Sequence, residues 1–88
     1  MSVRVIVPTQ LRGYTDGKSE VDAAGATLAA VLADLDRQFP GFRFRVIDEQ
    51  DRVRQHMNIF VAGVPTRSLD ARVGADDEVC IIQALSGG

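Results

Sequence analysis

The sequence predicts an α+β fold in which one main helix lies across a mixed sheet of four to five strands. Two observations support this prediction. Runs of β-branched residues stand near both ends of the chain, and one strongly amphipathic segment lies between them. The chain has 88 residues, of which 45% are hydrophobic, and this length and composition are enough to form one domain with a single core. We expect this domain to span residues 1–84, and residues 85–88 to form a flexible Gly-Gly tail.

The first expected elements are two antiparallel strands. Residues 3–8 form the first strand, and Pro8 at its end lacks a backbone donor, which limits further pairing. Asp16-Gly17 is a common hairpin signal, so residues 19–23 are expected to return as the second strand. Alternation places three valines of the first strand on one face: Val3, Val5 and Val7.

Residues 27–39 form the clearest helix of the sequence. Thr27 is a suitable N-cap, because its hydroxyl can accept a hydrogen bond from a free backbone amide of the first turn. Pro40-Gly41 ends the helix. One apolar stripe with helical spacing is expected to face the core: Leu28, Val31, Leu32, Leu35 and Phe39.

The second half of the chain holds the remaining strands. Residues 42–56 are expected to form a short helical turn and a charged loop around residues 48–51. Residues 58–62 form a strand, residues 63–65 turn out of it, and residues 78–84 form the last strand. If the first and last strands are parallel neighbours at the centre of the sheet, the architecture is a β-grasp, as in ubiquitin. The order of elements alone leaves other topologies open.

Composition excludes several classes of function. The net charge of −2, without a strong basic cluster, argues against nucleic-acid binding. No apolar run approaches the roughly 18 residues of a membrane-spanning helix, and the first apolar run is too short for a signal peptide. A single cysteine excludes an internal disulfide framework and suits a reducing compartment, so we expect a cytoplasmic protein.

No catalytic or metal-binding constellation emerges from the sequence. His56 is a lone histidine without partners at ligand spacing, which predicts a surface or structural role and no metal site. Cys80 is expected to be an inert thiol, because no basic residue near it in sequence would lower its pKa. No glycine-rich phosphate loop is present. We therefore expect a protein that is not an enzyme and binds no cofactor.

Two features are candidates for partner docking. Phe60 alternates away from Ile59 and Val61, so one of the two faces of this strand is free for a partner, although alternation does not decide which face is core. Five arginines are interspersed with acidic residues between positions 37 and 54. A solvated face is the default interpretation of these charges, and partner docking is the alternative. The arginines are Arg37, Arg43, Arg45, Arg52 and Arg54.

The carboxyl-terminal pair Gly87-Gly88 is the main functional candidate. Neither residue has a side chain, so the terminal carboxylate could pass through a narrow channel and approach a nucleotide closely. A plain flexible end is the alternative interpretation.

Four stretches resemble the MoaD/ThiS family of bacterial sulfur-carrier proteins, and the CysO-like branch in particular. The likeness covers essentially the whole chain. The stretches are Pro8-Thr9-Gln10-Leu11-Arg12, Phe39-Pro40-Gly41, Asn58-Ile59-Phe60-Val61, and Asp76-Asp77-Glu78-Val79 with the closing Ala84-Leu85-Ser86-Gly87-Gly88.

The chain departs from the family pattern at two places. Many relatives have proline where this chain has Gln83, and the change restores a backbone donor that could extend strand pairing. Many also have Val-Asn-(Gly/Asp) where this chain has Val61-Ala62-Gly63.

The resemblance implies a β-grasp fold and a sulfur-carrier function. A separate activating enzyme would use ATP to adenylate Gly88, and sulfur would then displace AMP to leave a thiocarboxylate. Gly87 would give clearance, and Leu85 and Ser86 would line the channel entrance. The other partner would be a sulfur-accepting biosynthetic enzyme, either of the cysteine-synthase type or the large subunit of molybdopterin synthase.

Several alternatives to this function remain open. The chain could be the small subunit of molybdopterin synthase, a ubiquitin-like modifier that forms isopeptide bonds, or a β-grasp interaction module that does not use its tail. A carrier for thiazole synthesis ranks lower, because such carriers tend to be shorter.

Overall fold

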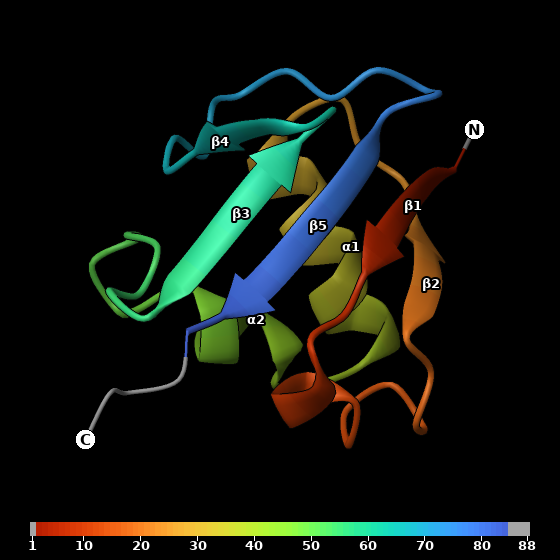
Figure 1. Ribbon diagram of the computed structural model, residues 1–88, viewed down its shortest axis with the longest axis vertical. Coiled ribbons are helices and arrows are strands. Elements are labelled where there is room, and N and C mark those ends of the chain that lie inside the picture. The colour runs from red at the N-terminus through yellow and green to blue at the C-terminus, as the bar shows by residue number, and fades with distance from the viewer. Residues whose placement is uncertain (1, 85–88) are drawn as a thin grey trace.

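The computed structural model describes residues 2–84, and these form a β-grasp fold (Figure 1). The sheet has the strand order β2-β1-β5-β3-β4. β1 and β5 are parallel neighbours near its centre, and the other neighbouring pairs are antiparallel. The predicted α+β class and the β-grasp topology are confirmed. The strands are β1 (Val3–Ile6), β2 (Glu20–Ala23), β3 (Met57–Val61), β4 (Val64–Thr66) and β5 (Glu78–Gln83).

The helices lie against one face of this sheet, and the core fills the space between them (Figure 1). They are the main helix α1 (Leu28–Gln38), the short helix α2 (Phe42–Val46) and the 3-10 turn η1 (Thr9–Leu11). The period-2 pattern of the strands decides which side chains enter the core. The predicted inward valines Val3, Val5 and Val7 are at most 1% exposed. Ile59 and Val61 of β3 also face the core, and Phe60 between them lies on the open face of the sheet.

α1 begins and ends as its sequence predicts. The Thr27 hydroxyl accepts a hydrogen bond from the amide of Ala30 at 3.2 Å, which confirms the N-cap. Phe39, predicted as the last residue of the stripe, is instead the C-cap, and its half-buried ring packs at the edge of the core. The rest of the predicted stripe is fully buried: Leu28, Val31, Leu32 and Leu35.

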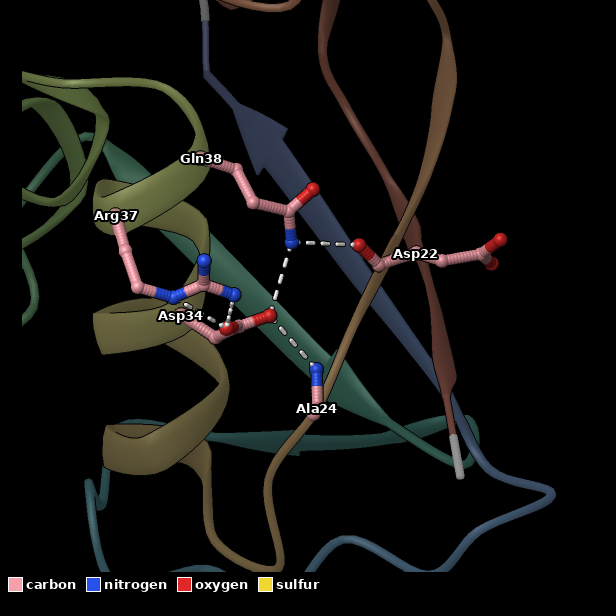
Figure 2. Close-up of polar contacts among 5 residues, drawn as sticks. All are labelled: Asp22, Ala24, Asp34, Arg37 and Gln38. Atoms are coloured by element: carbon pink, nitrogen blue, oxygen red, sulfur yellow. Dashed lines mark hydrogen bonds and ion pairs between the residues drawn. The ribbon is translucent and has the colours of Figure 1, made fainter.

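Polar contacts hold α1 against β2 and the residues that follow it (Figure 2). The carboxylate of Asp34 accepts a hydrogen bond from the amide of Ala24 at 2.9 Å, and it also accepts bonds from the side chains of Arg37 and Gln38. Gln38 donates a second bond to the carbonyl of Asp22, 2.9 Å away. The hydrogen bond from Ala24, followed by the bond from Arg37, holds the pKa of the Asp34 carboxyl below its ordinary value.

The segment after α1 forms the predicted helical turn and charged loop. Phe42 of α2 is fully buried. In the loop, the carboxylate of Asp48 accepts hydrogen bonds from the amides of Gln50 and Arg52 at 2.8 and 3.0 Å. These two hydrogen bonds from the loop's own backbone hold the turn together, so the loop before β3 is compact.

The prediction that residues 63–65 only turn out of β3 was wrong, because Val64–Thr66 form the edge strand β4. Ala62 and Gly63 have φ of 51° and 81° and make a two-residue hairpin connection. Alanine is rarely found in this left-handed region, so the expected turn did not suggest a connection as tight as this one, with a strand directly after it. Pro65 is acceptable in β4 because the strand lies at the edge of the sheet.

Candidate functional site

The candidate site lies at the carboxyl end of β5, a strand paired on both sides near the centre of the sheet (Figure 1). β5 ends at Gln83, one residue before the predicted end. The amide of Ala84 still donates a hydrogen bond to the carbonyl of His56 at 2.8 Å, so the chain remains fixed against β3 through Ala84. The predicted tail residues Leu85, Ser86, Gly87 and Gly88 lie outside the described residues.

The register of β5 shows which way its amides point. In an antiparallel pair, alternate residues bond to the partner strand. Ala62 and Ala84 mark the bonded positions, since the amide of Ala62 donates to Glu78 and that of Ala84 donates to His56. Gln83 lies between bonded positions, opposite Met57, so its amide points away from β3. We expected the amide of Gln83 to extend the strand pairing. This expectation was wrong, because the last hydrogen bond to β3 comes from the amide of Ala84.

On its other side, β5 extends past the end of β1. β1 pairs with β5 only as far as Ile6 opposite Cys80. Val7 turns its amide toward Ser19 on the β2 side, so the next position facing β5 belongs to Pro8, which has no N–H. The predicted role of Pro8 in ending the pairing is confirmed. A shallow groove separates the segment after β1 from the last residues of β5, and Gln83 lines it.

An apolar row crosses the open face of the sheet near this end. Cys80 at its centre lies opposite Ile6 of β1 and opposite Phe60 of β3, and Phe60 lies opposite Pro65 of β4. Ile6, Phe60 and Cys80 are half-buried. Burial, followed by the negative charge of Glu78, raises the pKa of the Cys80 thiol above its ordinary value, so this thiol is a weak nucleophile at neutral pH. Phe60 thus lies within a half-buried apolar surface on the open face of the sheet.

Comparison with known proteins assigns this fold to a family. The family model described as "ThiS family" matches residues 5–88. The chain belongs to the ThiS family.

Its relatives include sulfur carriers of the CysO type. The sulfur carrier protein CysO of Mycobacterium tuberculosis is 36% identical over 93 aligned residues, which cover 100% of both chains. Its crystal structure matches with a TM-score of 0.89 and 32% identity, covering 94% of this chain and 99% of that one. A chain of the Amycolatopsis orientalis BexX/CysO complex matches with a TM-score of 0.90 and 30% identity, covering 98% and 99%. The resemblance to the CysO-like branch is confirmed.

A second surface of this ThiS-family chain adjoins the end of β5. It is an open hollow lined by Phe44 and Arg45 of α2 and by Arg54 and His56 from the segment before β3. Gln83 also lines this hollow. The sequence indicated these arginines only as part of a mixed charged face. It gave no sign that the ring of Phe44 would be 52% exposed beside them.

The remaining candidate from the sequence, the lone histidine, lies at the surface. His56 is exposed, and within residues 2–84 no group of three histidine, cysteine or acidic side chains is arranged to hold a metal ion. Among the described helices, none has the length and apolar character needed to cross a membrane.

Proposed function

We propose that this chain, a CysO-like sulfur carrier of the ThiS family, carries sulfur as a thiocarboxylate on Gly88. The observation that supports this most strongly is the full-length likeness to CysO, together with a family match that runs through residue 88. The chain is a protein substrate rather than an enzyme. ATP is bound by a separate activating enzyme, and the carrier itself holds no cofactor.

The chemistry follows from the poor reactivity of a carboxylate toward nucleophiles. A carboxylate oxygen of Gly88 attacks the α-phosphorus of ATP, pyrophosphate leaves, and an acyl-adenylate forms. Mg²⁺ and cationic groups of the activating enzyme neutralise the phosphate charge. Sulfide then attacks the acyl carbon, and AMP leaves with the C–O bond electrons, so the product is a thiocarboxylate. Gly87 gives the clearance this needs, and Leu85 and Ser86 line the entrance of the enzyme's channel.

The fold supports this function by holding the root of the tail. Because Ala84 is bonded to His56, a bound partner meets the last described residue at a fixed point, beside the hollow lined by Arg45 and Arg54 and near the apolar row. We propose that the apolar row around Phe60 docks the partners. These are the activating enzyme and a sulfur-accepting biosynthetic enzyme of the cysteine-synthase type, acting in the cytoplasm. The BexX/CysO complex of A. orientalis supports the idea of a dedicated protein partner.

Mass spectrometry of the full chain tests the proposal. The chain is incubated with an activating enzyme of its own organism, Mg-ATP and sulfide. We expect a mass gain equal to the difference between a sulfur and an oxygen atom, and no gain for a chain that lacks Gly87 and Gly88. Conjugates to lysines of other proteins would indicate a modifier instead. Unchanged sulfur delivery in a strain carrying only the shortened chain would refute the carrier function.

A further inference from the structure

Charge is unevenly distributed along β5. A hollow at the start of the strand is lined by the acidic residues Asp22, Asp76, Asp77 and Glu78, together with Arg4. The hollow at its end is lined by Arg45, Arg54 and His56. Six residues of strand separate the two ends by about 17 Å. The end from which the tail leaves is therefore the positive end of a molecule whose net charge is −2.

Arg54 is held in place by contacts that leave part of its guanidinium available. Its Nε donates a hydrogen bond to the carbonyl of Phe44 at 2.8 Å, and its guanidinium carbon lies 4.6 Å from the centre of the Phe44 ring. Within residues 2–84, its terminal amino groups have no hydrogen-bond acceptor. A guanidinium already fixed on a ring loses little conformational entropy when it binds a carboxylate.

Arg45 supplies a second cation on the same hollow. It is exposed, and its guanidinium carbon lies 5.9 Å from the centre of the Tyr14 ring. In the described part of the chain, neither Arg45 nor Arg54 has a carboxylate within 4.0 Å, whereas Arg43 pairs with Asp51 at 3.2 Å. The nearby Asp48 is engaged by amides of its own turn. Neither cation thus forms an ion pair within residues 2–84, although Arg54 still attracts the Asp48 carboxylate over a longer distance.

We propose that the arginine patch, formed by Phe44, Arg45, Arg54 and His56, is a docking site for an acidic segment of the activating enzyme that receives the tail. The proposal rests on the proposed function. Four residues beyond Ala84 span at most about 14 Å, so a protein that takes the end of the chain must approach this patch. A fixed guanidinium can bind a carboxylate through two parallel, charge-assisted hydrogen bonds. A nucleic acid extended along the molecule would bring its phosphates to the acidic hollow at the other end of β5, whereas a short acidic segment would contact the patch alone, which favours a protein partner.

Binding of the full chain to the activating enzyme tests the patch. The dissociation constant is measured by calorimetry without ATP, so that binding is separated from adenylation. We expect Arg45→Glu to weaken binding about tenfold at low salt, and the loss to shrink severalfold near 0.5 M salt. Arg54→Lys keeps the positive charge but removes the planar guanidinium, which can donate two parallel hydrogen bonds to a carboxylate. It should therefore weaken binding less than Arg45→Glu does. Arg72→Glu makes the same charge change at an exposed site outside the patch and is the matched control.

The outcomes separate this proposal from the proposed function. A wild-type chain that binds but is never adenylated refutes the thiocarboxylate mechanism and still leaves the effect of Arg45→Glu measurable. Equal losses for Arg45→Glu and Arg72→Glu, or a loss independent of salt, overturn the patch. Tighter binding by Arg45→Glu also overturns it, since the patch would then be holding the chain's own carboxylate. If Arg45→Glu abolishes binding of a single-stranded RNA but leaves binding of the enzyme unchanged, the patch is a nucleic-acid site and the protein partner is overturned.

Discussion

The amide of Ala84 donates a hydrogen bond to the carbonyl of His56 at 2.8 Å, and it holds the end of β5 against the start of β3. The adjacent amide of Gln83 points the other way, toward the groove beside Pro8. This relationship explains how a position where the family resemblance implies proline can carry glutamine here. Neither residue at position 83 supplies a donor to β3, so strand pairing does not depend on the choice.

Two proline substitutions test this reading of the register. Ala84→Pro removes the donor to His56 and should lower the free energy of unfolding by about 1 kcal/mol. Gln83→Pro removes an amide that does not bond to β3 and should change it by less than about 0.5 kcal/mol. Urea unfolding of both variants measures the difference. A Gln83→Pro variant that is the less stable of the two would show that the register is wrong.

The sequence predicted the elements whose causes are local. The Thr27 cap, the apolar stripe of α1 and the inward valines of β1 depend on neighbours within one or two turns. β4 was missed because it depends on Ala62 adopting a left-handed conformation that alanine rarely takes. The amides of Leu28 and Ala29 donate to the carbonyls of Ala71 and Leu69. No local pattern predicts such a contact between a helix start and a distant loop.

The candidate site divides in the same way between what local sequence suggests and what the fold brings together, and its tail residues remain a prediction. The tail glycines and Phe60 stand out from sequence and resemblance alone. The arginine patch does not, because it forms only when α2 and the segment before β3 are brought together beside Gln83. The stacking of Arg54 on Phe44 joins residues ten positions apart with no regular spacing between them.

Gly25 provides a test of packing at the start of α1. A Cβ on Gly25 would lie 2.6 Å from the amide nitrogen of Val31 and 2.8 Å from the carbonyl carbon of Ala30. Both are backbone atoms of the helix and cannot move aside without shifting it. Gly25→Ala should therefore lower the free energy of unfolding by about 1–3 kcal/mol.

The matched control for this substitution is Gly13→Ala, since nothing lies within 4 Å of a Cβ at Gly13. It should change stability by less than about 0.5 kcal/mol. Thermal unfolding followed by circular dichroism compares the two variants. Equal stability would mean that the approach of Gly25 to the helix is looser than the structure describes.

The Asp34 carboxyl should make stability depend on acid pH. Its hydrogen bonds from Ala24 and Arg37 hold its pKa below the ordinary value of 3.8 in the folded state. The stabilisation is therefore complete above the pKa of the unfolded chain and is lost as pH falls through the lower folded pKa. Asp34→Asn should lower the Tm near neutral pH, and it should reduce the fall of Tm below about pH 4.

Asp70→Asn is the comparison for this prediction, because Asp70 is an exposed carboxylate whose side chain makes no hydrogen bond within the described residues. Its acid-dependent fall of Tm should match that of the wild type. If Asp34→Asn keeps the full acid dependence of the wild type, other carboxylates are responsible for it.

Docking through the apolar row can be tested at Phe60 and observed at Cys80. Phe60→Glu places a charge at the centre of the row and should raise the KM for the carrier in adenylation severalfold, with kcat unchanged. Val64→Glu is the control, because Val64 is 64% exposed on β4 but lies opposite Val61, outside the row.

The raised pKa of Cys80 predicts slow alkylation of its thiol by iodoacetamide at neutral pH. Bound activating enzyme should slow this alkylation further, because Cys80 lies beside Phe60. Unchanged alkylation in the complex, together with equal KM values for both variants, would place the docking surface elsewhere.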